Sequence, residues 1–369
     1  MPATPSNKPR FRRSRFWQAL TLAVVSTGLA TLAHADDSDV PSLAGKRIAI
    51  SMTGTSHYFD VKAFEAQVAE VKRLGGTPIT LDAGRNDKNL VTQLQTVVTQ
   101  KPDAVIQTLG TLSVIDPWLK RISKAGIPLF TIDAPSQYSL NNTTSDNVAT
   151  GKNLAAQLVA DSGGKGNILV FNGFYGVPVC AIRYDQLKLA LKDHPELKII
   201  DPELRDVIPN TVQDAYSQVS ALLNKYPKGS VTAIWSAWDI PQLGASKALV
   251  DAGRTEIKTY GVDGTPEVLE LIKRSDSPVG AVVAQQPALI GKTAVQNVAR
   301  YLAGQHDLPK ETQVPTLLTT AANLEQVQTL RGDQWRSRRC ICKESPNASA
   351  PLRHWMAWIC ELNVARSTG

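Results

Sequence analysis

The sequence predicts an α/β protein with two Rossmann-like lobes, each built on a doubly wound parallel sheet. Runs rich in β-branched and aliphatic residues recur about every 25 to 30 residues, which is the length of one strand and one helix. Apolar residues at helical spacing fill the intervals between these runs. The alternation forms two series that meet near residue 145, so we expect the chain of 369 residues to contain two lobes.

The first series of strands is predicted at residues 47–52, 78–81, 104–107 and 128–132. Four apolar residues on one face indicate a helix between the second and third strands: Leu90, Leu94, Val97 and Val98. Asn86 or Asp87 can cap the start of this helix, and Gly75 and Gly126 stand where the neighbouring helices should end.

The second series has strands at residues 167–171, 197–200, 230–237, 257–262 and 279–284. A helix follows with Ile290, Ala294 and Val298 on one face, and a short strand-like run occupies residues 314–319. Asp263 falls at the carboxyl end of the fourth of these strands, and Thr265 can cap the next helix. Open α/β sheets bind ligands beside the carboxyl ends of their strands, so Asp263 is a candidate site residue.

Residues 1–35 have the three parts of a secretory signal peptide. A basic segment ends at Arg15, an apolar run covers residues 16–32, and Ala33-His34-Ala35 is a small-x-small cleavage site. A membrane anchor is the alternative, but several polar residues and a glycine interrupt the apolar run. We therefore expect a protein that is exported from the cytoplasm.

Residues 331–369 form an atypical tail because they do not continue the pattern of strands and helices. Cys340, Cys342, His354 and Cys360 could be metal ligands, but their spacing matches none of the strong zinc patterns. A disulfide among the three cysteines is favoured over a metal site in an exported chain, and a tail that adds nothing to the fold is favoured over both. We predict no metal site.

The distribution of charge argues against a protein that binds nucleic acid. Of the formal charge of +7, residues 1–35 carry +5 and residues 331–369 carry +4, which leaves −2 for the segment between them. The body of the protein therefore has no excess of positive charge with which to attract phosphate backbones.

The sequence lacks the motifs of common catalytic and cofactor sites. No Gly-x-Ser-x-Gly nucleophile elbow occurs, and no Gly-x-Gly-x-x-Gly follows the first strand. Gly291-Lys292-Thr293 fails as a phosphate-binding loop because Gln286 stands where that motif needs a glycine. We predict that the protein uses no cofactor.

Polar and aromatic residues recur near the carboxyl ends of the strands in both series. The set comprises Thr53, His57, Phe59, Asp133, Trp238, Asp239, Asp263 and Gln285, with Arg183 in the helix after the strand at 167–171. Carboxylates, an arginine and an amide can hydrogen-bond to adjacent hydroxyls, and a ring can stack on a C–H face. Each single residue could instead be a helix cap, but the set as a whole predicts a cleft for a small neutral polyol.

Several motifs occur in order over about residues 46–320: Ile48-Ala49-Ile50 followed by Phe59, Phe130-Thr131-Ile132-Asp133, Ser145-Asp146-Asn147 with Gly151-Lys152, Arg183, Ala237-Trp238-Asp239 with Leu243-Gly244-Ala245, Gly261-Val262-Asp263-Gly264-Thr265-Pro266, and Gln285-Gln286-Pro287 with Ile290-Gly291. In combination they resemble the periplasmic sugar-binding proteins of ABC importers, and the ribose-binding branch in particular. The resemblance implies two lobes joined by a three-segment hinge. The first lobe would comprise residues 46–144 plus 286–314, and the second residues 145–285 plus 315–330.

The resemblance also implies a ligand held between the lobes. Its contacts would be Thr53, His57, Phe59 and Asp133 from the first lobe, Arg183, Asn210, Trp238 and Asp263 from the second, and Gln285 at the edge of the hinge. Four of these match the residue types of the family: Asp133, Arg183, Asp263 and Gln285.

Three positions depart from the ribose-binding pattern. Ala134 stands where ribose binders have an arginine, Asp60 where they have a second phenylalanine, and Trp238 where they have an asparagine. We therefore expect a ligand with a larger C–H face or fewer hydroxyls than ribose, such as a hexose or a deoxysugar. If Trp238 packs in the core of its lobe instead, only Asp239 would face the crevice.

The implied function is that of a periplasmic solute-binding protein. It would be a monomer without enzymatic activity that captures a small sugar or sugar-like molecule and delivers it to an ABC permease, with a chemoreceptor as a candidate second partner. A repressor of the same fold would begin with a helix-turn-helix segment rather than an export signal. The remaining alternative is an extracytoplasmic hydrolase that uses Asp133 and Asp263 as paired carboxylates.

Overall fold

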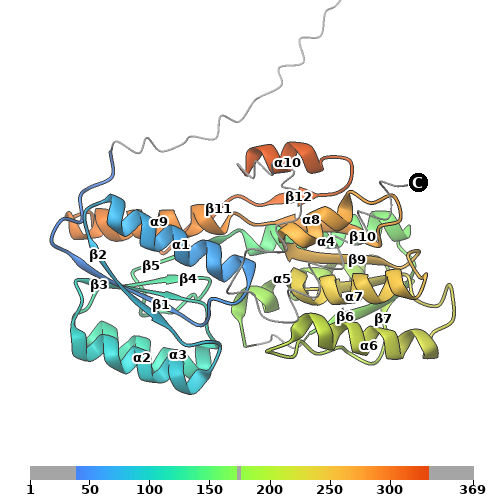
Figure 1. Ribbon diagram of the computed structural model, residues 1–369, viewed down its shortest axis with the longest axis horizontal. Helices are drawn as coiled ribbons and strands as arrows, with labels where there is room; N and C mark the ends of the chain where they lie inside the picture. Colours follow the sequence, from blue (N-terminus) through green and yellow to red (C-terminus); the bar gives the residue numbers. More distant parts are fainter. Residues whose placement is uncertain (1–38, 173–175, 332–369) are drawn as a thin grey trace, which may run out of the picture. The chain divides into compact units, whose positions relative to one another are not determined.

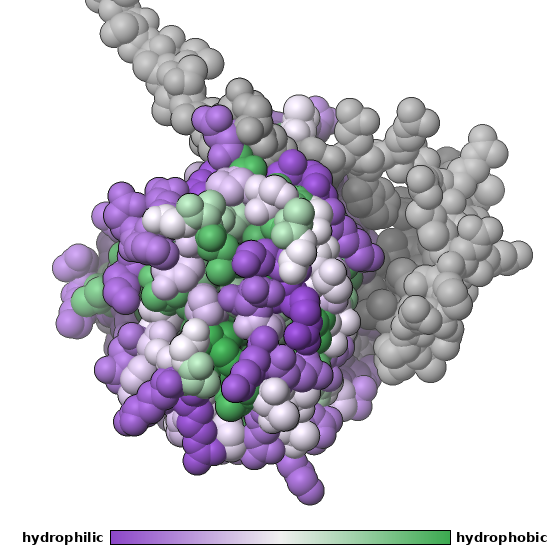
Figure 2. Space-filling view, turned by 90° about the vertical axis from the view of Figure 1, so that its left-hand side faces the viewer, coloured by the Kyte–Doolittle hydropathy of each residue, from purple (hydrophilic) through white to green (hydrophobic). Residues whose placement is uncertain are grey.

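The computed structural model describes residues 39–172 and 176–331 (Figure 1). The predicted signal peptide and the tail beyond Arg331, with its cysteines, lie outside the described residues. Within the described part of the chain, each helix is too short or too polar to cross a membrane. On the face drawn in Figure 2, hydrophilic side chains are interspersed with smaller apolar patches.

Two six-stranded sheets organise the fold (Figure 1). The first contains β1 (Arg47–Met52), β2 (Thr77–Asp82), β3 (Ala104–Thr108), β4 (Leu129–Ile132), β5 (Asn141–Ser145) and β11 (Glu311–Val314). The second contains β6 (Gly166–Phe171), β7 (Leu197–Ile199), β8 (Ala233–Ser236), β9 (Lys258–Asp263), β10 (Val279–Ala284) and β12 (Leu317–Thr319).

The two sheets repeat one arrangement of strands. Their orders are β2-β1-β3-β4-β5-β11 and β7-β6-β8-β9-β10-β12. All neighbours in the first sheet are parallel, whereas the edge strand β12 of the second sheet runs antiparallel to β10. The prediction of two doubly wound α/β lobes is confirmed, with β12 as the one antiparallel strand among the described residues.

Helices cover both faces of each sheet (Figure 1). In the first lobe, one pair of packed helices lies on each face: α1 (Tyr58–Arg73) with α9 (Pro287–Leu302), and α2 (Asp87–Gln100) with α3 (Leu112–Lys124). The pairs in the second lobe are α4 (Asn147–Ser162) with α5 (Pro178–Lys192), and α6 (Thr211–Lys225) with α7 (Asp239–Asp251). The short helices α8 (Pro266–Ile272) and α10 (Leu324–Leu330) contact β10 and β12 respectively.

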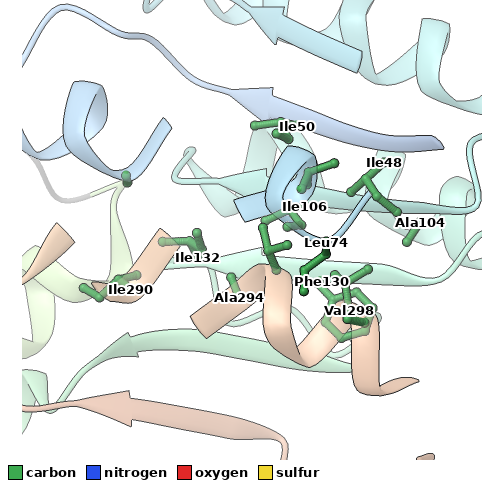
Figure 3. Close-up of a cluster of buried hydrophobic side chains, with 14 of the residues drawn as sticks. Ile48, Ile50, Leu74, Ala104, Ile106, Phe130, Ile132, Ile290, Ala294 and Val298 are labelled. Carbon is green, nitrogen blue, oxygen red and sulfur yellow. The ribbon is translucent and has the colours of Figure 1, made fainter. Parts of the chain in front are cut away.

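The core of the first lobe follows from the alternation of side chains along its strands. Ile48 and Ile50 point toward α1 and α9, whereas Ala49 between them packs against α2 and α3. Figure 3 shows the apolar cluster between the first sheet and the pair α1 and α9, in which Ala294 and Val298 of α9 lie against the strands. The apolar face predicted for this helix is therefore confirmed.

The chain passes between the two sheets three times, from β5 to α4, from β10 to α9 and from β11 to β12. At the first two crossings, the helix that follows covers the sheet that the chain enters. The crossings fall at residue 146, residues 285–286 and residues 315–316. The three short connections are the structural basis for a hinge between the lobes.

The strands β5 and β11 of the first sheet were not predicted. Residues 141–145, which form β5, are all polar. Residues 314–319 were expected to form one run, but they contain the end of β11 and the whole of β12, which lie in different sheets. A network of side-chain hydrogen bonds permits the burial of β5: the Asn141 side chain donates to the Pro309 carbonyl at 2.8 Å and accepts from Asn297 at 3.1 Å. Hydrophobic periodicity cannot reveal a strand that is stabilised in this way.

The predicted helix ends are confirmed in position. Asn86 caps α2 by accepting a hydrogen bond from the Asn89 N–H at 3.1 Å, and Gly75 and Gly126 have positive φ angles just after α1 and α3. Thr265 stands at the N-cap of α8, but its side chain makes no capping bond.

Candidate functional site

A cavity lies where the carboxyl ends of the two sheets approach each other. It encloses about 420 Å³ of space between atoms, part of it open to solvent. Its lining comes from both lobes and comprises His57, Phe59, Asp60, Arg85, Leu109, Asp133, Val177, Val179, Cys180, Arg183, Trp238, Asp263 and Gln285. The position agrees with the rule that open α/β sheets bind ligands beside the carboxyl ends of their strands.

Most of the predicted site residues meet at this cavity: His57, Phe59, Asp133, Arg183, Trp238, Asp263 and Gln285. Two do not line it. The Thr53 hydroxyl donates to the Thr108 carbonyl at 3.1 Å, and Asn210 is exposed just before α6.

Sequence reasoning missed five lining residues, namely Arg85, Leu109, Val177, Val179 and Cys180. Arg85 and Leu109 follow β2 and β3 closely, so the strand-end rule would have found them if it had been applied to every strand. Of the three departures from the ribose-binding pattern, Asp60 and Trp238 line the cavity. Ala134 is buried in the apolar cluster beside α2 and α3.

Asp133 and Asp263 occupy corresponding places in the two lobes. Asp133 follows β4 and Asp263 ends β9, which are the fourth strands in the two sheet orders. Both have positive φ angles, 53° and 121°, which are unfavourable for residues other than glycine. Backbone strain of this kind is found mostly where a function requires a side chain in a particular place.

Burial raises the pKa of both carboxyls, and that of Asp263 rises to about 6. The Arg183 guanidinium opposes this rise in both cases, as does a hydrogen bond to each carboxylate. Asp133 accepts from the Thr144 hydroxyl, and Asp263 accepts from the Gln285 side chain at 2.5 Å. Each carboxylate is thus held in one orientation at the cavity wall.

Gln285 connects this site to the crossings between the lobes. Its amide group donates to Asp263, and its side-chain oxygen accepts from the Ser145 hydroxyl at 2.7 Å. Ser145 ends β5 and Gln285 follows β10, so the chain of hydrogen bonds joins two crossing segments to a cavity residue. A rotation at the crossings would therefore move Asp263 relative to the first lobe.

Arg183 is a buried cation of the second lobe, with 2% of its surface exposed. Its Nε donates to the Asn147 side chain at 2.8 Å, and Nη1 donates to the Ala237 carbonyl at 2.9 Å. Nη2 is buried and has no hydrogen-bond partner within the described part of the chain. Two fixed bonds therefore orient a third donor group at the cavity.

Trp238 and His57 come from opposite lobes, and their rings are in contact at the cavity wall. Their ring centroids are 4.8 Å apart, and the Trp238 indole N–H donates to Asp206 at 2.6 Å. Burial lowers the pKa of His57 to about 3, so its ring is neutral at physiological pH. Trp238 thus lies in the cleft, whereas Asp239 is fully buried and accepts from the Thr265 backbone N–H at 2.6 Å.

Asp60 and Arg85 form a buried ion pair within the first lobe. Asp60 is 1% exposed and the side chain of Arg85 is 9% exposed. The Arg85 guanidinium lies 5.9 Å from the Trp238 ring, so the second lobe covers the pair. Burial raises the pKa of Asp60, against the opposing effects of Arg85 and of the His57 backbone N–H.

Arg331 links the two lobes beside the cavity. Its guanidinium donates to the Tyr58 hydroxyl at 2.6 Å and to the Gly264 carbonyl at 2.9 Å. Tyr58 lies between the lining residues His57 and Phe59, and Gly264 follows Asp263. The arginine therefore holds two lining segments from opposite lobes together.

The chemistry of the lining is that of recognition by hydrogen bonds. The described residues contain no group of three or more histidine, cysteine or acidic side chains able to hold a metal ion. Carboxylates that accept, arginines that donate and an indole that stacks are suited to a molecule rich in hydroxyl groups. Two lobes around such a cavity, joined by short crossings, define a two-lobed binding protein that encloses a small ligand.

The chain belongs to the periplasmic binding protein domain family, whose model matches residues 48–306. A solute-binding protein of an ABC transporter from Agrobacterium vitis, solved with bound allitol, is 64% identical. That match covers 78% of this chain and 100% of the other, with a TM-score of 0.77.

Two further relatives illustrate the breadth of the family. An ABC sugar transporter subunit from Rhodobacter sphaeroides 2.4.1 is 59% identical over 76% of this chain and 100% of the other, with a TM-score of 0.75. The ribose import binding protein of Escherichia coli K12 is 24% identical over 292 residues, which are 78% of this chain and 95% of that protein.

Proposed function

We propose that this protein is the solute-binding component of an ABC importer and that it binds a polyol or a small sugar between its lobes. The observation that carries the proposal is the set of unpaired polar atoms around the cavity. Asp60 Oδ1, Arg85 Nε and Arg183 Nη2 are buried without a hydrogen-bond partner among the described residues. Such atoms are costly unless a ligand pairs with them.

The preferred ligand is a linear or cyclic polyol of about six carbons. The 64% identical protein from Agrobacterium vitis was solved with allitol, a hexitol, and that identity is high enough to expect a related ligand here. Ribose is disfavoured because Trp238 brings an indole to the cavity, which favours a longer C–H face over additional directional hydrogen bonds.

Binding is proposed to close the two lobes by bending at the three crossings. A ligand that contacts Asp60 and Arg85 in one lobe and Arg183 and Asp263 in the other would favour the closed form, because only that form makes both sets of contacts. The closed surface would then be recognised by the membrane permease. Export to the periplasm, a monomeric state and a chemoreceptor as second partner belong to the same proposal.

The proposal does not include the hydrolase alternative, because the family to which the chain belongs consists of binding proteins for transport. A direct test is to incubate the protein with allitol and with a methyl riboside, whose glycosidic bond a hydrolase with paired carboxylates could cleave, and to recover both compounds. We expect both to be recovered unchanged, and a hydrolysed or otherwise altered product would contradict a pure binding function.

Calorimetry with the purified protein tests the ligand class. We expect allitol to bind more tightly than ribose, and we expect a Trp238→Asn variant to lose at least about tenfold in affinity for allitol while its affinity for ribose changes less. The melting temperature should rise with allitol concentration, since a ligand that binds only the folded state stabilises it. Ribose as the tighter ligand would refute the assignment.

A further inference from the structure

The loop after β2 is built to bring Arg85 into the cavity. Arg85 has a φ angle of 56°, in the left-handed region, and its backbone N–H donates to the Thr53 carbonyl at 2.7 Å. A Cβ atom at Gly54 would lie 2.5 Å from Arg85 Cγ, so the absence of a side chain at position 54 makes room for the arginine. The Asp82 side chain accepts from the Gly84 N–H at 2.8 Å and fixes the preceding turn.

The ion pair that this loop creates is costly to bury. Removing a carboxylate and a guanidinium from water carries a penalty of several kcal/mol for each ion, which only good geometry and further hydrogen bonds offset. Asp60 and Arg85 are both almost entirely buried and both line the cavity. A pair that served stability alone would be expected to use all of its hydrogen-bonding capacity.

This pair does not use all of its capacity. Arg85 Nη2 donates to Asp60 Oδ2, but Arg85 Nε and Asp60 Oδ1 make no hydrogen bond to any described residue. Nε and Nη2 lie on one edge of the guanidinium, and a complete two-pronged pair would engage both of them with both carboxylate oxygens. One donor and one acceptor of the same pair therefore remain without a partner among the described residues.

We propose that Asp60 and Arg85 form a subsite that binds one hydroxyl group of the ligand, an inference that rests on the proposed polyol-binding function. The hydroxyl donates its hydrogen to Asp60 Oδ1 and accepts a hydrogen bond from Arg85 Nε. Both atoms lie in cavity-lining residues, and the Trp238 ring, which lies near Arg85, covers the subsite from the other lobe. The subsite is therefore complete only when the lobes are closed.

The chemistry of the subsite makes it selective for a hydroxyl group. A C–H group leaves both protein atoms unpaired, and a carbonyl oxygen pairs with Arg85 but leaves Asp60 Oδ1 without a donor. A hydroxyl satisfies both atoms at once because it is donor and acceptor together. Asp60 and Arg85 thus act as specificity-determining residues at one end or one face of the bound polyol.

The test combines deoxy ligands with substitutions of the pair. The affinities of allitol and of each of its monodeoxy derivatives are measured by calorimetry for the full-length protein and for an Asp60→Leu/Arg85→Met double variant. Replacing both ions avoids an uncompensated buried charge, so the double variant should fold. Arg73→Met is the control, because Arg73 forms a complete two-pronged pair with Glu70 on α1 and does not line the cavity.

For the unaltered protein, we expect at least one monodeoxy derivative to bind roughly 10- to 100-fold more weakly than allitol. In the double variant, allitol and that derivative should bind with affinities within about twofold of each other, since the groups that recognise the hydroxyl are gone. The Arg73→Met control should retain the full preference for allitol.

Other outcomes overturn the proposal. For each deoxy derivative that binds weakly, its affinity relative to allitol is compared between the two proteins. If this ratio is the same in the double variant as in the unaltered protein, the hydroxyl is recognised elsewhere. Equal affinity of all derivatives for the unaltered protein would show that no hydroxyl is bound selectively, and this outcome would overturn the proposal without any variant. If allitol itself binds to neither protein, both the polyol-binding function and the subsite are refuted. Failure of the function is thus distinguished from failure of the subsite alone, in which allitol still binds.

Discussion

Replacement of Arg183 by methionine should separate ligand recognition from the general stability of the second lobe. The guanidinium is 2% exposed and makes two fixed hydrogen bonds, to Asn147 and to the Ala237 carbonyl, while Nη2 remains available to a ligand. Methionine preserves most of the apolar stem and removes the charge together with all the donors.

Two effects follow from these contacts, one on ligand binding and one on stability. Loss of a charge-assisted hydrogen bond to the ligand should cost about 1.5 to 3 kcal/mol of binding, or roughly a 10- to 150-fold rise in Kd. Loss of the donors to Asn147 and Ala237 should lower the free energy of unfolding by at least about 2 kcal/mol, because both oxygens are left without these partners.

The same substitution should change the pH dependence of binding. Arg183 lowers the pKa of Asp133 and Asp263, which burial raises, so its removal raises both pKa values further. Ligand hydroxyls favour the ionised carboxylates, so the affinity of the unaltered protein should be constant well above pH 6 and fall as the pH drops through about 6, the pKa of Asp263. In Arg183→Met this fall should begin at a higher pH.

Calorimetric titration with allitol between pH 5 and pH 8 measures both quantities. Arg254→Met is the matched control, because Arg254 also donates to backbone carbonyls, those of Tyr226 and Pro227, but does not line the cavity. It should lose stability and keep its affinity. If Arg183→Met bound allitol as tightly as the unaltered protein and with the same pH profile, Arg183 would not contact the ligand.

Three other substitutions test separate features of the molecule. Asp206 has a pKa of about 6 in place of the usual 3.8, mainly because it is buried. The folded state therefore keeps this proton as the pH rises from about 4 to about 6, and the free energy of unfolding falls by roughly 3 kcal/mol over that interval. Asp206→Asn removes this loss, so its melting temperature relative to the unaltered protein should be higher at pH 7 than at pH 4, and a difference independent of pH would contradict the assignment. Arg331→Met removes the bond to Tyr58 that joins the lobes, so stopped-flow measurements should show allitol dissociating about 5- to 30-fold faster at an unchanged association rate. A change confined to the association rate would exclude a role of Arg331 in holding the closed form. Gly291→Ala places a Cβ atom 2.4 Å from the Ala63 carbonyl oxygen, so α1 and α9 must separate. The free energy of unfolding measured by denaturant titration should then fall by about 1 to 3 kcal/mol, whereas unchanged stability would show that the two helices separate without cost.

The sequence by itself determined the fold class and most of the strands. The bounds predicted for β1 and β10 agree with the structure, and Asp133 and Asp263 were found from their positions at strand ends. These inferences succeed because they depend on local signals. Hydrophobic periodicity indicates which residues are buried, and doubly wound sheets bind their ligands beside the carboxyl ends of the parallel strands.

Only the tertiary structure decided which side chains meet. Asp60 and Arg85 are 25 positions apart in the chain, and Arg331 reaches Tyr58 across 273 positions, so no local pattern predicts either contact. The direction in which Trp238 points was likewise open until the structure placed its ring 4.8 Å from that of His57 in the other lobe. Such pairings depend on how two lobes and their loops approach in space, and strand and helix periodicity carries no information about that approach.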